Sequence, residues 1–175
     1  PGVRASLEDP VTSADINVRG LALMLQAARA AGVPHFVFAS SSSVYGERSH
    51  GPFKETDRVD HPVSPYAATK KAGELLCHSF AHAFGTSIAA LRFFTVYGPR
   101  QRPEMAIAAF ARAIATGEPL TVLGDGSARR DFTYIDDIVA GVVRAIDRPG
   151  GCRIYNLGRG ETVTVMETIR LLEEA

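Results

Sequence analysis

The sequence predicts an α/β protein built on a parallel sheet. Two short apolar segments, 35–39 and 86–94, follow turn residues and carry little charge, which is typical of strands buried on both faces of a parallel sheet. A helical segment lies between them; it begins at Pro65 and ends at Gly85. A strand, a crossover helix and a second strand in this order predict parallel pairing with a right-handed connection.

The composition is that of a globular chain without charge bias. The 175 residues carry no net formal charge, and 46% of them are apolar and 22% charged. The balanced charge provides no electrostatic footprint for nucleic acid or membranes, and no apolar stretch is long enough to span a bilayer, so we expect neither partner. Cys77 and Cys152 lack metal-ligand spacing, so we expect no metal site and two reduced thiols in a cytoplasmic protein.

The first expected element is a helix over 10–31, where apolar residues recur at helical intervals until a glycine stops it. The strand 35–39 then runs directly into four serines, Ser40–Ser43. Hydroxyl groups at the carboxyl end of such a strand lie where open α/β sheets bind their ligands. Between Gly46 and Ser64 we expect a polar surface loop.

The helix after this loop carries a candidate catalytic pair. Ser64 is a preferred capping residue, and Pro65 suits the first helical position. Tyr66 and Lys70 are one helical turn apart, so their phenol and ammonium groups can reach one substrate-sized space. A free tyrosine has a pKa of about 10, and a close cation that lowers this pKa would let Tyr66 act as a base near neutrality. Tyrosine and lysine at this spacing also occur on helices without a catalytic role.

The character of the chain changes after a linker over 99–103. Acidic residues at one helix start, and capping-box spacing at another, support two helices in this part. The expected elements are, in order, a helix over 105–116, a strand over 120–123, a turn over 124–127, a helix over 136–148, a strand over 154–157 and a terminal helix that begins at Thr164.

Taken together, these motifs are similar to those of a known family. The serine-rich strand end, the run Val44-Tyr45-Gly46 and the later pair Tyr66 and Lys70 resemble the extended short-chain dehydrogenase/reductases that act on nucleotide sugars. The resemblance covers nearly the whole chain, and it implies NAD as the cofactor and a UDP-sugar as the substrate.

The resemblance also implies an architecture. It predicts a partial Rossmann-like, doubly wound parallel sheet over 1–98, which is the C-terminal half of an NAD-binding domain and carries the catalytic residues. It predicts part of a smaller sugar-nucleotide-binding domain over 99–175, with the helix 136–148 packing back on the sheet. In this family, dimers form through the helix that carries the catalytic tyrosine and the helix before it, so we expect a homodimer of the full-length protein.

The glycine-rich turn that cradles a dinucleotide pyrophosphate is not found in the sequence. Gly124-Asp125-Gly126 leads to arginines rather than to a helix, and Gly158-Arg159-Gly160 lacks a third glycine. We therefore expect the chain to be a fragment that starts after the cofactor-cradling half and binds NAD weakly by itself. The choice between NAD and NADP stays open at this point.

The family resemblance assigns roles to individual residues. Tyr66 is the expected base, Lys70 lowers its pKa and holds the nicotinamide ribose, and Ser41 hydrogen-bonds the reacting hydroxyl group. Ser42 and Ser43 stand where the related dehydratases carry acidic residues, so elimination lacks its general acid and epimerisation is favoured. The expected cofactor-binding residues are Asn17, Ser40, Tyr66, Lys70 and Phe93, and the expected substrate-binding residues are Ser42, Ser43, Thr95, Arg102 and Arg130.

Within the family, the segments 61–71 and 91–105 are most similar to those of epimerases that act on UDP-glucuronate. A uronic acid carries a carboxylate, which the planar fork of Arg102 can bind through two parallel hydrogen bonds. The alternative for Arg102 is a surface position paired with Glu104. The resemblance thus implies NAD-dependent epimerisation at C4 of UDP-glucuronate or UDP-galacturonate through a transient 4-keto intermediate.

Three alternatives to this function stay open. The first is a 4-epimerase for neutral UDP-hexoses such as UDP-glucose, which needs no carboxylate clamp. The second is a nucleotide-sugar decarboxylase or dehydratase. The third, from a different class, is a non-catalytic fragment that keeps the fold and acts as a binding module.

Overall fold

The computed structural model describes residues 2–47 and 52–175 and confirms the α/β class with a parallel sheet. The chain divides into two units. The first unit comprises Pro1–Phe93 and Ala140–Leu157, and the second comprises Phe94–Val139 and Gly158–Ala175. Part of the expected surface loop, residues 48–51, lies outside the described residues.

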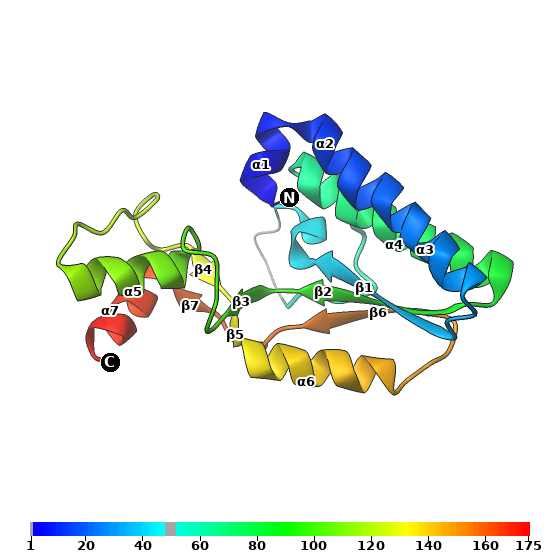
Figure 1. Cartoon of the computed structure of the whole chain (residues 1–175). Coiled ribbons are helices and arrows are strands. Elements are labelled where there is room, and N and C mark those ends of the chain that lie inside the picture. The colour runs from blue at the N-terminus through cyan, green and yellow to red at the C-terminus, as the bar shows by residue number, and fades with distance from the viewer. Residues whose placement is uncertain (1, 48–51) are drawn as a thin grey trace. The chain divides into compact units, whose positions relative to one another are not determined.

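The first unit is built on a three-stranded sheet in the order β1-β2-β6 (Figure 1). Both pairings are parallel, as the order of strand and helix along the chain predicts. The register aligns Ser40 with Arg92 and Arg92 with Asn156, so a row of three polar residues crosses the sheet near the carboxyl ends of its strands. The strands are β1 His35–Ser41, β2 Ser87–Phe93 and β6 Cys152–Leu157.

Most helices of the chain belong to this first unit. The helix α6 Ile135–Ile146 begins in the second unit and ends in the first. The other elements of the first unit are α1 Val3–Glu8, α2 Pro10–Ala14, the π-helical turn η1 Asp15–Arg19, α3 Gly20–Ala30, the 3-10 turn η2 Ser42–Tyr45 and α4 Pro65–Phe84.

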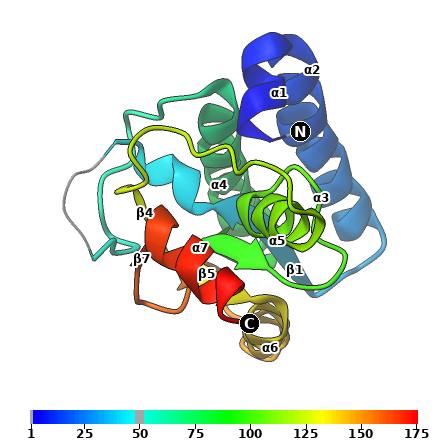
Figure 2. The same cartoon turned by 90° about the vertical axis from the view of Figure 1, so that its left-hand side faces the viewer.

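Helices cover both faces of the sheet (Figure 1). On one face, Phe38 and Ile88 pack with Leu25 of α3, and α4 lies beside α3 in both views (Figures 1 and 2). On the other face, Leu91 packs with Ala145 of α6. Burial on both faces explains why the strands read as nearly continuous apolar runs in the sequence.

The helix expected over 10–31 is present as the succession α2, η1 and α3. It ends at Ala30 with Ala31 as the C-cap, and the following Gly32 adopts the left-handed conformation with φ of 67°. The preceding helix α1 is an addition to the expected elements. It has six residues and no side-chain cap, so its start carries no sequence signal.

The helix α4 begins and ends where its capping residues predict. The hydroxyl of Ser64 accepts a hydrogen bond from the Ala67 amide at 3.2 Å, and Pro65 occupies the first helical position. Gly85 terminates the helix in the left-handed conformation with φ of 68°. The bounds of α4 therefore follow from local chemistry alone.

The second unit contains two small sheets and two neighbouring helices. The helices α5 Ala106–Thr116 and α7 Val165–Glu173 pack against each other (Figure 2). The hydroxyl of Thr164 accepts from the Glu167 amide at 3.0 Å, which confirms the predicted start of the terminal helix. The pairings are parallel between β3 Thr95–Tyr97 and β5 Phe132–Tyr134, and antiparallel between β4 Arg129–Arg130 and β7 Val163–Thr164.

The prediction of a strand over 120–123 is wrong. The structure describes these residues and assigns them to no strand, and the side chain of Leu123 is 73% exposed. An apolar run needs a neighbouring backbone to become a strand. In this unit the arginine pair Arg129–Arg130 takes the partner strand Val163–Thr164 instead.

Candidate active site

The serines at the end of β1 form a turn that keeps their hydroxyl groups at the edge of the sheet. Ser41 is the last residue of β1, and its hydroxyl donates to Ser43 Oγ at 3.1 Å and accepts from the Ser43 amide at 3.2 Å. Ser42 and Ser43 open the 3-10 turn η2, which packs against α4. This places the serines at the carboxyl end of a parallel strand, where ligands bind in open α/β sheets.

Lys70 reaches the same strand from α4. Its ammonium donates a hydrogen bond to the carbonyl oxygen of Ala39 at 2.9 Å, two residues before Ser41. The Lys70 Nζ atom also lies 5.6 Å from the centroid of the Tyr66 ring. Burial lowers the pKa of Lys70. One cation therefore contacts both the strand that carries Ser41 and the helical turn that carries Tyr66.

The backbone of Tyr66 is held on both sides. Its amide donates to Ser6 Oγ of α1 at 3.0 Å, and its carbonyl oxygen accepts from Thr69 Oγ1 at 2.8 Å. Thr69 Oγ1 in turn accepts from the side-chain amide of Asn17 at 2.9 Å. Asn17, expected to hold the cofactor region, thus braces the turn of α4 that carries Tyr66. Ser6 and Thr69 have no sequence signal that would have singled them out.

A buried ion pair lies one helical turn beyond Lys70. The Arg92 Nε and Nη2 atoms donate to the two carboxylate oxygens of Glu74, each at 2.8 Å, and both side chains are 1% exposed. Ser40 Oγ, expected at the cofactor, donates to Glu74 Oε1 at 2.7 Å. Burial opposes ionisation of Glu74, but the hydrogen bonds from Arg92 and Ser40 outweigh it, so the pKa of Glu74 lies below its ordinary value.

The network continues from Arg92 to the third strand. Arg92 Nη1 donates to the Tyr45 hydroxyl at 2.9 Å, and that hydroxyl donates to Asn156 Oδ1 at 2.7 Å. The Arg92 guanidinium carbon lies 4.8 Å from the centroid of the Tyr45 ring. Burial works against the charge of Arg92, but its hydrogen bonds to Glu74 and Tyr45 raise its pKa above the ordinary value.

From Pro52 onward, the segment between Gly46 and Ser64 is bound to the rest of the first unit and is not only the surface loop that we expected. The side-chain amide of Asn156 donates to the Phe53 carbonyl at 3.0 Å, and the Asn156 backbone amide donates to Glu55 Oε1 at 2.8 Å. The ring of Phe53 stacks on that of Tyr45 with centroids 4.5 Å apart. Residues 53–55 are therefore fixed to β6 and η2 by contacts between residues far apart in the sequence.

The remaining predicted residues divide between the two units. Phe93 ends β2 in register with Ser41 and packs on the cluster around Leu91. Thr95, Arg102 and Arg130 belong to the second unit. The Thr95 amide donates to the Asp131 carbonyl at 3.0 Å. Arg102 pairs with Glu104 at 3.5 Å, and 65% of the Arg102 side chain is exposed. Arg130 is exposed and donates to the Arg129 carbonyl at 2.8 Å.

Sequence patterns do not single out Asp131, which organises a turn of the second unit. Its carboxylate accepts hydrogen bonds from the amides of Arg159 at 3.0 Å and Gly160 at 2.8 Å and from the Thr133 hydroxyl at 2.8 Å. A buried carboxylate satisfied in this way is fixed in place. It holds the Gly158–Gly160 turn beside β5.

Within residues 2–47 and 52–175, no cluster of three His, Cys, Asp or Glu side chains could hold a metal ion. No helix in these same ranges has both the length and the apolar character needed to cross a membrane.

The first unit contains the groups that proton transfer to and from a hydroxyl requires. Tyr66 provides a phenol and Ser41 a hydroxyl, and Lys70 provides a cation that lies near the Tyr66 ring and bonds to the carbonyl of Ala39 on the strand that carries Ser41. A tyrosine stabilised by a neighbouring cation can take a proton from a substrate hydroxyl group and return it. This chemistry is compatible with hydride transfer when a nicotinamide cofactor is bound.

The chain is similar to known proteins in both its sequence and its fold. The profile of a family described as "NAD dependent epimerase/dehydratase family" matches residues 1–158. A UDP-glucuronate 4-epimerase of Thermodesulfobacterium geofontis is 45% identical over 173 residues, which cover 98% of this chain and 53% of that protein.

Solved structures extend the likeness to the fold. The UDP-glucuronic acid 4-epimerase from Bacillus cereus, in complex with UDP-glucuronic acid and NAD, has a TM-score of 0.91 at 39% identity over 99% of this chain and 56% of that one. The UDP-glucose 4-epimerase of Thermotoga maritima with UDP-glucose has a TM-score of 0.93 at 34% identity, and the match covers 98% of this chain and 57% of that one. The chain thus spans about half the length of the relatives it matches.

Proposed function

Because the chain belongs to the NAD dependent epimerase/dehydratase family, we propose that its protein epimerises C4 of UDP-glucuronate and UDP-galacturonate with NAD. The observation that carries this proposal is the position of Lys70. Its ammonium bonds to β1 beside the serines and lies 5.6 Å from the Tyr66 ring, so one charge acts on both the base and the end of the strand.

The proposed reaction moves one proton and one hydride out and back. Tyr66, as the phenolate, takes the proton of the substrate 4-hydroxyl, while Ser41 hydrogen-bonds the same oxygen. Lys70 stabilises the phenolate by its positive charge. A bound NAD would supply the acceptor and donor for the C4 hydride, so that the sugar would pass through a 4-keto form, and Tyr66 would give the proton back to the 4-oxygen.

Lys70 suits the nicotinamide end of the cofactor. An ammonium group has three N–H donors, and the carbonyl of Ala39 accepts one of them, which leaves donors for ribose hydroxyls. Tyr66, Asn17, Ser40 and Phe93 are the further proposed cofactor residues. Asn17 and Ser40 already bond to α4, so we propose that they act on the cofactor chiefly by shaping this end of the site.

The turn after β1 favours epimerisation over elimination. Ser42 and Ser43 provide hydroxyl groups, whereas loss of hydroxide from a sugar needs a carboxylic acid that can donate a proton. Hydroxyl groups instead suit hydrogen bonds to the sugar. We therefore assign both serines to substrate binding.

Arg102 is the proposed partner of the uronate carboxylate. In the structure it pairs with Glu104 at 3.5 Å, and the two side chains are 65% and 57% exposed. Such an exposed pair contributes little free energy, so exchanging Glu104 for a substrate carboxylate costs little. Thr95 and Arg130 are proposed to contact the sugar and the pyrophosphate of UDP.

A second candidate substrate is UDP-glucose, because the related Thermotoga maritima structure holds that sugar nucleotide. The native, full-length protein is to be incubated with NAD and each of UDP-glucuronate and UDP-glucose, and the products identified by proton NMR. We expect UDP-galacturonate from the first and little product from the second. Equal turnover of both would assign the protein to neutral hexoses, and carbon dioxide release would assign it to the decarboxylases.

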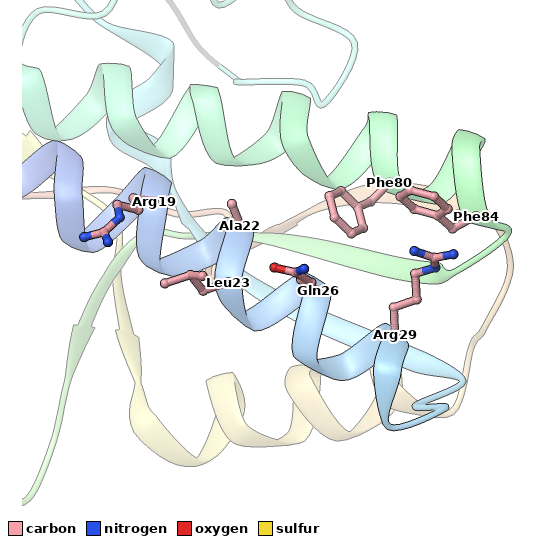
Figure 3. Close-up of a pocket in the computed structure, with 7 residues that line it drawn as sticks. All are labelled: Arg19, Ala22, Leu23, Gln26, Arg29, Phe80 and Phe84. Carbon is pink, nitrogen blue, oxygen red and sulfur yellow. The ribbon is translucent and has the colours of Figure 1, made fainter.

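We also propose that the protein is a cytoplasmic homodimer that joins through α3 and α4. These helices border a hollow with an exposed apolar rim, where Leu23 is 55% and Phe84 46% exposed (Figure 3). The guanidinium of Arg29 lies 4.0 Å above the Phe84 ring. A second copy of the same two helices would cover this face through a two-fold axis. Analytical ultracentrifugation of the native protein tests the dimer by its mass, and a sedimenting species of one protomer would contradict it.

A further inference from the structure

We propose that Glu74 and Arg92 are positioning residues, which hold the Tyr66–Lys70 turn of α4 in register with the serine end of β1. The inference rests on the proposed function, because it assigns the ion pair to the same reaction. Neither residue reaches the substrate in this proposal. Both act through the side chains that do.

The pair connects the two elements that carry the proposed catalytic residues. Glu74 is four residues after Lys70, so both side chains leave the same face of α4. Its Oε1 atom accepts from Ser40, which directly precedes Ser41, at 2.7 Å. A shift of α4 along its axis would therefore break a contact to the residue beside Ser41.

Arg92 fixes that contact from the middle of the sheet. It lies in register with Ser40 on one side and with Asn156 on the other. Its two parallel hydrogen bonds to Glu74 fix the orientation of the two side chains as well as their distance. Its third hydrogen bond goes to the hydroxyl of Tyr45, the last residue of η2. The strand end, the turn after it and the helix thus share one guanidinium.

Stability alone does not account for a buried pair of this kind. Removing two charges from water costs several kcal/mol for each ion, and apolar pairs of similar volume are often equally stable or more so. Apolar side chains, however, permit a helix to slide, because their contacts have no direction. The bidentate geometry provides what an apolar pair lacks, which is a single position of α4 along the strand ends.

The test separates position from stability in the native, full-length protein. The variant Glu74→Leu/Arg92→Met removes both charges, and Arg92→Lys keeps the charge but loses the fork. The control Arg170→Met/Glu174→Leu removes the exposed pair of α7, whose nitrogen–oxygen distance is 3.3 Å. For each variant the readouts are the melting temperature, kcat and KM on the UDP-sugar, and amide hydrogen exchange of the peptides 39–43 and 64–71.

For the double variant at the buried pair we expect a melting temperature within a few degrees of wild type, a kcat at least 30-fold lower, and KM within about threefold. We expect Arg92→Lys to lower kcat about tenfold. In both variants, exchange should accelerate in 39–43 and 64–71 and stay unchanged in α7. The control should match wild type in every readout.

Two outcomes would overturn the inference. One is wild-type kcat together with wild-type exchange in both variants. The other is loss of kcat that comes with faster exchange throughout the chain, which would make the pair a purely structural one. If wild-type protein converts no UDP-sugar, the proposed function fails, and the exchange of 39–43 and 64–71 still decides whether the pair positions this turn.

Discussion

Two ion pairs, one in each unit of the chain, hold their charged side chains in opposite ways. In the first unit, Glu74 and Arg92 are each 1% exposed and share two hydrogen bonds of 2.8 Å. In the second unit, Arg102 and Glu104 are 65% and 57% exposed and approach only to 3.5 Å. A buried, bidentate pair permits one geometry, whereas an exposed pair exchanges readily with water and other ions. Under the proposed function, the buried pair would hold the reaction geometry of the first unit, and exposed Arg102 of the second unit would exchange Glu104 for a ligand carboxylate.

The largest effect should come from the first unit. In the native, full-length protein, Tyr66→Phe removes the proposed base, so turnover of the UDP-sugar should fall by roughly 10²–10⁴-fold. Affinity for the UDP-sugar, measured by calorimetry, should change less than about threefold, because the ring and the fold are kept. A residual rate within tenfold of wild type would remove Tyr66 from the base role.

The two ion pairs should differ sharply in stability when one partner is removed. Glu74→Leu leaves the Arg92 charge buried without its partner, which should cost about 3–5 kcal/mol of unfolding free energy. The matched change Glu104→Leu in the exposed pair should cost less than about 1 kcal/mol. Urea unfolding followed by circular dichroism measures both. Similar costs at the two sites would contradict the distinction between a fixed and an adjustable pair.

The smallest effect should appear in substrate choice. Arg102→Ala should lower kcat/KM for UDP-glucuronate about 10–100-fold, because a charge-assisted hydrogen bond contributes about 1.5–3 kcal/mol, and should leave any turnover of UDP-glucose unchanged. Arg112→Ala, a change at another exposed arginine of the same unit, serves as the control. An equal loss on both sugars would indicate that Arg102 does not read the carboxylate.

Local chemistry accounts for the parts of the fold that the sequence predicts well. Ser64, Gly85 and Thr164 mark helix ends because caps and left-handed glycines act within a few residues. The strand expected over 120–123 failed for the opposite reason, since pairing depends on a distant strand and those residues have none.

The candidate site shows the same limit. Tyr66 and Lys70 stand out because their spacing brings them together on one helix. Glu74 and Arg92 do not stand out, because they are 18 residues apart and meet only after β2 has joined the sheet. The anchoring of the loop after Gly46 is equally invisible in the sequence, since its partner Asn156 lies 101 residues from Glu55.

The buried pair also restricts how this chain can evolve. A substitution that removes the charge of Glu74 leaves the other charge buried alone, and the reverse holds for Arg92, so each single change passes through a less stable protein. Stability alone therefore permits sequences that retain both charges or lose both, whereas the proposed positioning role favours sequences that retain both. Among related sequences, substitutions at positions 74 and 92 are therefore expected to occur together rather than singly.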